Sequence, residues 1–227
     1  MCGRYTLYGH EDDLASLFEV DTYPLTARYN IAPTQEVPVV RQRPDGSREL
    51  SAMRWGLVPH WVKDPLTFKA NLFNARSESA AEKPSFRDAM RSARCIVPAS
   101  GFYEWQQRGR SKQPYHVVRN DGAPMAIAGL WATNTRGPQP LTSCTILTAA
   151  ANDDVASLHD RMPVILEREA WALWLDHSET EPDRLEALLA PAAPVLLRIY
   201  PVSREVGNAR VDKPELCEPW SEGLQFV

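Results

Sequence analysis

Cys2 has the most distinctive chemical potential in this chain, because it directly follows the initiator Met1. Removal of Met1, which a small second residue permits, leaves Cys2 with a thiol beside a free α-amine. Such a 1,2-aminothiol reacts with an aldehyde in two steps: the amine forms an imine, and the thiol closes a five-membered thiazolidine ring. The pKa of an α-amine is about 7.7–8.0, so about a tenth of it is neutral and nucleophilic at neutral pH. Taken alone, an ordinary cysteine is the simpler interpretation.

Two residues have the character of acid–base catalysts. Glu104 lies in the strand-like run Gly101–Trp105, among aromatic neighbours. It is either a solvated strand residue or a buried carboxyl group whose pKa is raised into the range of general acid–base catalysis. His159 lies in LHDRMPVIL, at residues 158–166, beside an Asp and an Arg that can fix its tautomer. A structural histidine explains the same pattern, so both interpretations stay open.

Asn74 and Arg76 lie in FNARSES, at residues 73–79, ahead of a predicted helix. They are either a helix cap and a surface charge, or an amide that orients a substrate hydroxyl and a guanidinium that binds a phosphate. Arg4, two residues after Cys2, can bind a phosphate in the same way.

Trp61 and Phe68 belong to a long irregular loop predicted over residues 54–72, which also contains Lys63 and Lys69. Aromatic and basic side chains in one loop can stack nucleic-acid bases and follow a phosphate chain. Core aromatics beside solvated lysines explain the same composition. Loops of this length within a compact domain are often functional.

The elements that must position these residues are mostly strands. A strand is predicted at 3–8 and a helix at 11–20, then a proline-bearing connection at 29–35 and a hairpin of strands 37–40 and 48–55. Helices are expected near 84–92, 167–175 and 181–190, and strands at 95–105 around a Ser100–Gly101 kink, 114–118, 125–131, 142–149 and 195–200. The pattern predicts one α+β domain over residues 1–227, built on a mainly antiparallel sheet.

Composition narrows the function classes. The 227 residues carry a net charge of −4, and the first 110 residues have 15 basic and 13 acidic side chains, a net of +2. Nucleic-acid binding would therefore need a local basic patch. The four cysteines show no zinc-site spacing, so no metal or other cofactor is predicted. Without a secretory or membrane-spanning segment, we expect a cytoplasmic protein with no membrane partner and with Cys2 reduced.

Three common enzyme signatures are absent from the sequence. There is no G-x-x-x-x-G-K-[ST], no G-x-G-x-x-G and no G-x-S-x-G. Phosphate-loop ATPases, dinucleotide enzymes and α/β-hydrolases therefore lose their usual signals.

Taken together, the motifs resemble the SRAP family, the SOS-response-associated peptidases that are also described as abasic-site processing proteins. The matching segments follow family order and cover nearly the whole chain. They are CGRY (2–5), YNIAPTQ (29–35), RWGLVPHW (54–61), FNARSES (73–79), CIVPASGFYEW (95–105), AGLW (128–131), TILTAAAN (145–152), LHDRMPVIL (158–166) and PVSREVGN (201–208).

The resemblance implies a fold and a function. It implies a compact α+β fold with a curved, mainly antiparallel, barrel-like sheet and a few flanking helices. It also implies binding of single-stranded DNA, or a single-strand/duplex junction, at an abasic site. A covalent crosslink through the N-terminal cysteine would then shield the lesion. A monomer that associates with the nucleoid when bound to DNA is expected.

The resemblance also assigns roles to individual residues. By position, the nucleophile is Cys2, the amide is Asn74, the carboxylate is Glu104 and the imidazole is His159. Arg4 and Arg76 match positions expected to hold DNA phosphates, and Trp61 and Phe68 are candidates for base stacking. Two alternatives stay open: an N-terminal-nucleophile cysteine peptidase that acts on its own N-terminus, and a non-catalytic DNA-binding module. The expected enzyme class is a crosslinking enzyme, with hydrolase and lyase as related classes.

Overall fold

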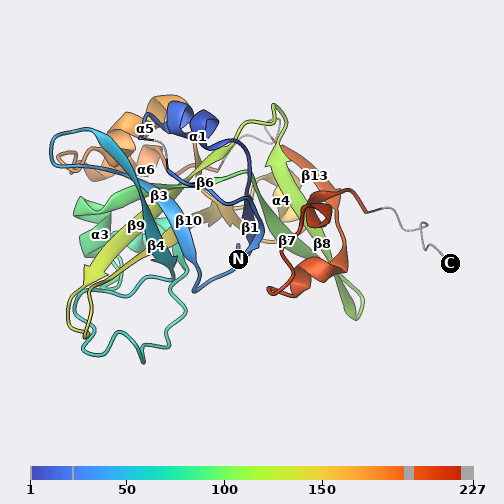
Figure 1. Ribbon diagram of the computed structural model, residues 1–227, viewed down its shortest axis with the longest axis horizontal. Coiled ribbons are helices and arrows are strands. Elements are labelled where there is room, and N and C mark those ends of the chain that lie inside the picture. Colours follow the sequence, from blue (N-terminus) through green and yellow to red (C-terminus); the bar gives the residue numbers. More distant parts are fainter. Residues whose placement is uncertain (1, 22, 192–196, 221–227) are drawn as a thin grey trace.

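The strands form two sheets, with short helices around them (Figure 1). The computed structural model describes residues 2–21, 23–191 and 197–220. The larger sheet lies on the left of Figure 1 and the smaller one on the right. This architecture confirms the expected α+β class with a curved, mainly antiparallel, barrel-like sheet and a few flanking helices.

Five strands of the larger sheet close into a ring. They are β3 (Glu36–Gln42), β4 (Arg48–Trp55), β6 (Arg94–Ala99), β9 (Met125–Asn134) and β10 (Leu141–Ala150). Neighbours pair in the order β10-β4-β3-β6-β9, and β10 also pairs with β9. The closing pair of β10 and β4 is parallel, with Ser143 opposite Arg54. Closure leaves these five strands without a free edge between them.

Three short strands extend this ring: β5 (Asn74–Arg76), β11 (Arg161–Pro163) and β12 (Ile165–Leu166). β5 runs parallel to β10, with Asn74 opposite Ile146, while β11 pairs antiparallel with the end of β10. The sequence did not predict β5, because a three-residue strand shows no periodicity and forms only through its pairing with β10.

The smaller sheet has the strand order β13-β8-β7-β1-β2. Its strands are β1 (Tyr5–Leu7), β2 (Arg28–Ile31), β7 (Gly101–Arg108), β8 (Ser111–Arg119) and β13 (Leu197–Pro201). The chain passes from β6 in one sheet to β7 in the other at the expected Ser100–Gly101 kink. A Cβ on Gly101 would lie 2.5 Å from Nε2 of His116, so the close strand crossing requires glycine.

The smaller sheet differs from the sequence prediction at its edge strand β2. Residues 29–35 were expected to be a connection, but residues 28–31 form the edge strand β2, paired with β1. Tertiary pairing overrides the weak local pattern there. Of the strand predicted at 195–200, residues 195 and 196 lie outside the described residues.

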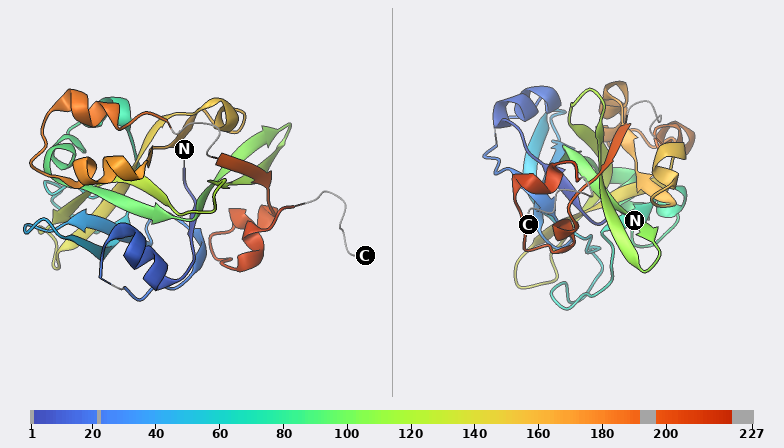
Figure 2. Two further views of the ribbon diagram at one scale, coloured as in Figure 1. Left: turned by 90° about the horizontal axis from the view of Figure 1, so that it is seen from above. Right: turned by 90° about the vertical axis from the view of Figure 1, so that its right-hand side faces the viewer.

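The helices are short and peripheral. They are α1 (Glu11–Phe18), α2 (Ser77–Ala80), α3 (Arg87–Ser92), α4 (Asp153–Ala156), α5 (Arg168–Leu175) and α6 (Pro182–Ala187), with the 3₁₀ turns η2 (Arg204–Gly207) and η3 (Pro214–Cys217). Phe18 of α1 stacks on Trp171 of α5 at 4.8 Å. Figure 2 shows η2 and η3, in orange and red, against the smaller sheet. Within the described ranges, no helix has the length and apolar character needed to cross a bilayer.

An aromatic core anchors the beginning of the chain. The ring of Tyr5 lies edge-on to the fully buried Trp55, with centroids 5.3 Å apart. The indole N–H of Trp55 donates to the carbonyl of Phe73 at 2.8 Å. This core therefore fixes both the first strand and the residue before Asn74, which places Cys2 and Asn74 on the same side of the molecule.

Candidate active site

The backbone around Cys2 is held against β7. The N–H of Tyr103 donates to the carbonyl of Arg4 at 3.0 Å, which continues the β1–β7 pairing toward the chain start. Cys2 is completely buried, and its thiol donates to the carbonyl of Arg4 with Sγ 3.8 Å from the oxygen. The residue expected to be the nucleophile is therefore fixed inside the fold rather than carried on a free end.

Asn74 contacts Cys2 directly. Its Nδ2 donates to the carbonyl of Cys2 at 2.8 Å, across 72 positions of sequence. The strand β5 holds the amide in place, because its backbone pairs with β10. The Oδ1 of Asn74 is buried, and no described residue donates a hydrogen bond to it. This oxygen is therefore available to a ligand or to an amine freed at Cys2.

Glu104 is a buried carboxyl group on β7, only 2% exposed. Its burial raises its pKa to about 7. Burial, and after it the charge of Glu104, raises the pKa of the Cys2 thiol far above its usual range. Glu104 therefore lies within electrostatic reach of Cys2 and can gain or lose a proton near neutral pH, whereas the thiol keeps its proton. The solvated-strand interpretation of Glu104 is wrong.

His159 lies on the turn between α4 and β11. Its Nδ1 is 3.0 Å from the backbone nitrogen of Arg161, which donates to it, and 2.8 Å from Oδ1 of Asp160. The side chain is 30% exposed, and burial lowers its pKa below the usual value. The charge of Asp160 also contributes to the raised pKa of Glu104, so this turn is within electrostatic reach of the carboxyl group.

The two predicted phosphate-binding arginines differ in their surroundings. Arg4 is half-buried, and its guanidinium donates to the carbonyls of Gly3 at 3.1 Å and Gly207 at 3.5 Å. Burial lowers its pKa. Arg76 is exposed at the end of β5. Arg4 therefore also ties the chain start to the end of η2, whereas Arg76 is free to face a ligand.

The two aromatic candidates stand apart from this cluster. Trp61 is 43% exposed, and its indole N–H donates to the carbonyl of Pro84 at 3.4 Å. Phe68 is half-buried in the irregular segment that follows. Within the part of the chain that the structure describes, no hydrogen bond or ring contact joins either side chain to the cluster of Cys2, Asn74, Glu104 and His159. Their role in base stacking stays a prediction.

The described residues contain no group of three or more His, Cys, Asp or Glu side chains arranged to hold a metal ion. The chemistry that the cluster can perform is proton transfer around Cys2. An amide holds the backbone of Cys2, a carboxyl group with a pKa near neutrality lies close to it, and an imidazole lies on the adjoining turn.

Comparison with known proteins shows the family of this chain. A family model described as SOS response associated peptidase (SRAP) matches residues 1–209. The chain belongs to the SRAP family. Several relatives bear the name abasic site processing protein, among them the following three. YoqW of Bacillus subtilis is 39% identical and covers 96% of this chain and 99% of its own length. YedK of Escherichia coli is 33% identical and covers 96% of this chain and 100% of its own length. HMCES of Gallus gallus is 36% identical and covers 86% of this chain and 67% of its own length.

Solved structures show the same fold. A crystal structure of a protein from Bordetella bronchiseptica superposes with a TM-score of 0.78 at 29% identity, over 89% of this chain and all of that one. A protein from Bacteroides thetaiotaomicron superposes with a TM-score of 0.87 over 97% of this chain and all of its own. Its identity of 22% supports the fold alone.

The SRAP site also contains residues whose contacts the sequence did not predict. The guanidinium of Arg161 makes a two-point ion pair with Glu78, at 2.6 and 2.8 Å, and also donates to the carbonyl of Thr148. This pair joins α2, which follows Asn74, to β11, which follows His159. The only sequence signal was a charged residue at the start of an apolar run, and that signal does not name its partner.

Proposed function

We propose that this SRAP protein acts as a monomer on single-stranded DNA, or on a single-strand/duplex junction, at an abasic site. It forms a covalent thiazolidine crosslink through Cys2 and so shields the lesion. One observation carries the proposal: Cys2 is buried at the chain start, where the amide of Asn74 donates to its carbonyl and the carboxyl group of Glu104, with a pKa of about 7, is within electrostatic reach. The names of its relatives support abasic sites as the substrate.

The reaction begins with the release of the amine. Met1 lies outside the described residues, and while it is attached the nitrogen of Cys2 is an amide and not a nucleophile. After its removal, the Cys2 amine is an ammonium ion for most of the time at neutral pH, with a pKa of about 7.7–8.0. Glu104, with a pKa of about 7, is about half ionised there, and its ionised form can take this proton. Asn74 holds the carbonyl of Cys2 while this occurs.

The sugar must open before it can react. An abasic deoxyribose is mostly a closed hemiacetal, and a proton delivered by His159 to the ring oxygen favours the open aldehyde. The amine adds to C1′, and the resulting carbinolamine loses water with the proton held by Glu104. The thiol then adds across the C=N bond, and its proton passes to nitrogen. One C–N bond and one C–S bond form, and one water leaves. Placing amine and thiol on one residue supplies the proximity.

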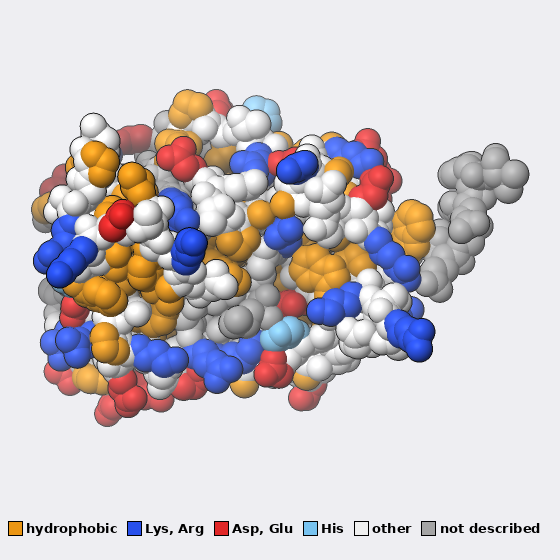
Figure 3. Space-filling view, turned by 90° about the horizontal axis from the view of Figure 1, so that it is seen from below, with side chains coloured by type: hydrophobic (Ala, Val, Ile, Leu, Met, Phe, Trp, Pro, Cys, Tyr) orange, Lys and Arg blue, Asp and Glu red, His pale blue; other side chains and the backbone are white. Residues whose placement is uncertain are grey.

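Charge on the surface supports a polyanionic ligand. Figure 3 shows a face on which Lys and Arg side chains form a broken row, with Asp and Glu side chains mostly toward its margins. Such a row attracts DNA although the whole chain carries a net charge of −4. Arg76 and Arg4 are the residues that we assign to phosphates, and Trp61 and Phe68 to base stacking.

The family is described as a peptidase, so the second candidate function is a cysteine peptidase that cleaves the protein's own N-terminus. A cysteine peptidase works through a thiolate, which a nearby cation or helix N-terminus normally stabilises. At Cys2 both burial and the charge of Glu104 act in the opposite direction and keep the thiol protonated. The site is therefore better suited to chemistry in which the amine reacts first.

Intact-mass measurement tests the proposal. Protein lacking Met1 is mixed with a single-stranded oligonucleotide that contains one abasic site. We expect a species with the mass of protein plus DNA minus one water, and none from Cys2→Ala, which should still bind the DNA non-covalently. DNA binding without any mass shift in the wild type would favour the non-catalytic module. A Cys2→Ala protein that crosslinks as stably as wild type would rule out the thiazolidine.

A further inference from the structure

The imidazole of His159 has two partners at the same nitrogen. Nδ1 accepts the N–H of Arg161 at 3.0 Å and lies 2.8 Å from Oδ1 of Asp160. The two contacts require different protonation states. The N–H of Arg161 needs a lone pair on Nδ1, whereas the carboxylate of Asp160 needs a hydrogen there. The ring therefore has a hydrogen-bond partner at Nδ1 in either state without rotating.

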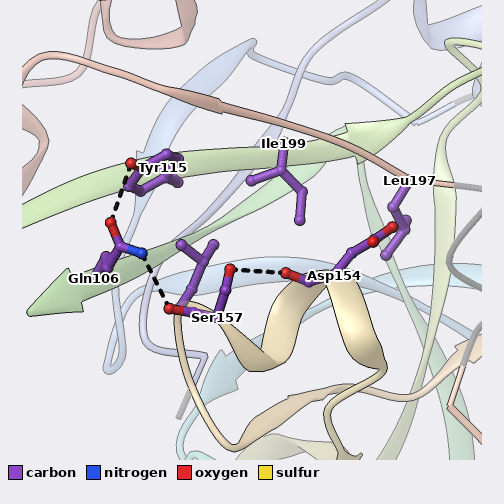
Figure 4. A pocket seen from close by; sticks show the side chains of 7 residues that line it. Gln106, Tyr115, Asp154, Ser157, Leu197 and Ile199 are labelled. Carbon is purple, nitrogen blue, oxygen red and sulfur yellow. Dashed lines mark hydrogen bonds between the residues drawn. The ribbon is translucent and has the colours of Figure 1, made fainter.

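The turn that carries His159 is fixed to the strand that carries Glu104. Gln106, on the same face of β7 as Glu104, donates from Nε2 to the carbonyl of Ser157 at 3.2 Å (Figure 4). Its Oε1 accepts from the hydroxyl of Tyr115 at 3.2 Å and from Nε of Arg108 at 3.0 Å, which fixes the orientation of the amide. Figure 4 shows this amide reaching from the hairpin to the turn after α4. The backbone before His159 is thus held.

Only one of the two states can act as an acid. A neutral ring with its hydrogen on Nε2 cannot release that hydrogen without becoming an anion. A ring that also carries a hydrogen on Nδ1 is a cation, and it can release the Nε2 hydrogen and become neutral. That is the state in which Asp160 is the partner. The guanidinium of Arg161 does not compete for Asp160, because it is paired with Glu78.

We infer that Asp160 is a positioning residue for the proposed reaction: it stabilises the Nδ1-protonated form of His159 in the same ring orientation that the N–H of Arg161 holds in the neutral form. Nε2 then keeps one direction while His159 gains and loses its proton. The inference rests on the proposed function, in which His159 delivers a proton to the sugar oxygen and recovers it when the crosslink reverses.

Several charged groups act on this imidazole and must be counted in any pH test. Burial lowers the pKa of His159, Asp160 raises it, and Lys112 on β8 lowers it. Glu104 on β7 is also affected, since Asp160 contributes to its raised pKa. The amine of Cys2 is the remaining group that titrates in the reaction. Asp160→Asn should therefore move the pKa of both His159 and Glu104 downward.

The test compares Asp160→Asn with Asp154→Asn, an exposed carboxylate on α4 nearby in the sequence. The pKa of His159 is measured by NMR titration of the DNA-free protein, and the crosslinking rate is measured across pH. We expect Asp160→Asn to lower that pKa and to slow crosslinking at pH 5–6 by about two- to fivefold, the size of an exposed ion pair. Asp154→Asn should behave as wild type, and Asp160→Glu should recover part of the loss.

Two outcomes would overturn the inference. One is an unchanged pKa of His159 in Asp160→Asn, and the other is a lowered pKa with an unchanged rate profile. A wild-type protein that forms no crosslink would instead contradict the proposed function, while the NMR titration would still decide whether Asp160 holds the protonated ring.

Discussion

Glu104 and His116 are both buried titratable residues on neighbouring strands of the smaller sheet, yet their positions differ. Glu104 on β7 is 2% exposed and lies near Cys2. His116 on β8 is completely buried and stacks on Tyr103 at 4.7 Å. Its ring nitrogens lie 3.0 Å from the hydroxyl of Tyr200 and 3.3 Å from that of Thr6. The first belongs to the candidate active site, and the second to the contact with the C-terminal turns.

Burial shifts the pKa values of Glu104 and His116 in opposite directions. Burial favours the neutral form of either group. For the acid Glu104 this raises the pKa from 4.5 to about 7, into the range where proteins exchange protons. For the base His116 it lowers the pKa from 6.5 to about 3, out of that range. The same physical cause therefore makes one residue fit for proton transfer and keeps the other neutral and structural.

Removing the carboxyl group should have the largest effect. Glu104→Gln should lower the crosslinking rate by roughly 10²–10⁴-fold, the usual contribution of general acid–base catalysis. Its rate should rise with pH through the titration of the free amine at about 7.7–8.0, because no base remains to take that proton. The wild type should show a flatter profile. Glu169→Gln on α5 is the matched control, and equal rates for Glu104→Gln and wild type at every pH would contradict the catalytic role.

Removing the buried imidazole should affect stability rather than rate. His116→Ala should cost about 2–4 kcal/mol of unfolding free energy, because it leaves a cavity and removes the hydrogen bonds of the ring to the hydroxyls of Thr6 and Tyr200. The pKa of His116 is lowered in the folded state, so its stabilisation is lost as pH falls from 6.5 toward about 3, and the variant should lack that acid-dependent loss. Denaturant unfolding measures both effects, with the exposed His10→Ala as control. A folded His116→Ala variant with a greatly reduced crosslinking rate would contradict the structural role of His116.

An exposed charge near the site provides a third case. Arg76→Ala should weaken binding to any single-stranded sequence by about tenfold and reduce the salt slope by about 0.7 per lost phosphate contact. Unlike the two buried residues, it should leave stability unchanged. Affinity measured at several salt concentrations tests this, with Arg168→Ala on α5 as control. Arg4→Ala should weaken binding and also lower stability, because Arg4 ties Gly3 to Gly207. Identical salt slopes in Arg76→Ala and wild type would make Arg76 structural.

Loss of the Glu104 carboxyl group should also increase stability, in contrast to the loss of His116. Its pKa is raised in the folded state, so the wild type loses stability as pH rises from 4.5 through about 7. Glu104→Gln carries no charge and should escape this loss, gaining about 2 kcal/mol relative to wild type between pH 5 and pH 8. Thermal unfolding at the two pH values measures it. A stability difference between Glu104→Gln and wild type that does not change with pH would mean that burial does not disfavour the ionised carboxyl group.

The sequence predicted the residues of the candidate active site but not the contacts between them. Strand alternation and turn residues predicted most of the sheet, including the kink at Ser100–Gly101. The motifs pointed to Asn74 and Glu104, but the hydrogen bond from Asn74 to Cys2 depends on the parallel pairing of β5 with β10. That pairing is non-local and leaves no periodic signal in three residues. The bond from Gln106 to the turn before His159 was invisible for the same reason.

The most direct test of the account locates the sugar on the protein. Crosslinked protein is digested with nuclease and protease, and the peptide that begins at Cys2 is analysed by mass spectrometry before and after borohydride treatment. We expect a peptide without Met1 that carries the abasic sugar minus one water and is unchanged by borohydride, because a thiazolidine has no C=N bond. The adduct on a lysine, on a peptide that retains Met1, or on a Cys2 peptide that borohydride reduces would contradict it.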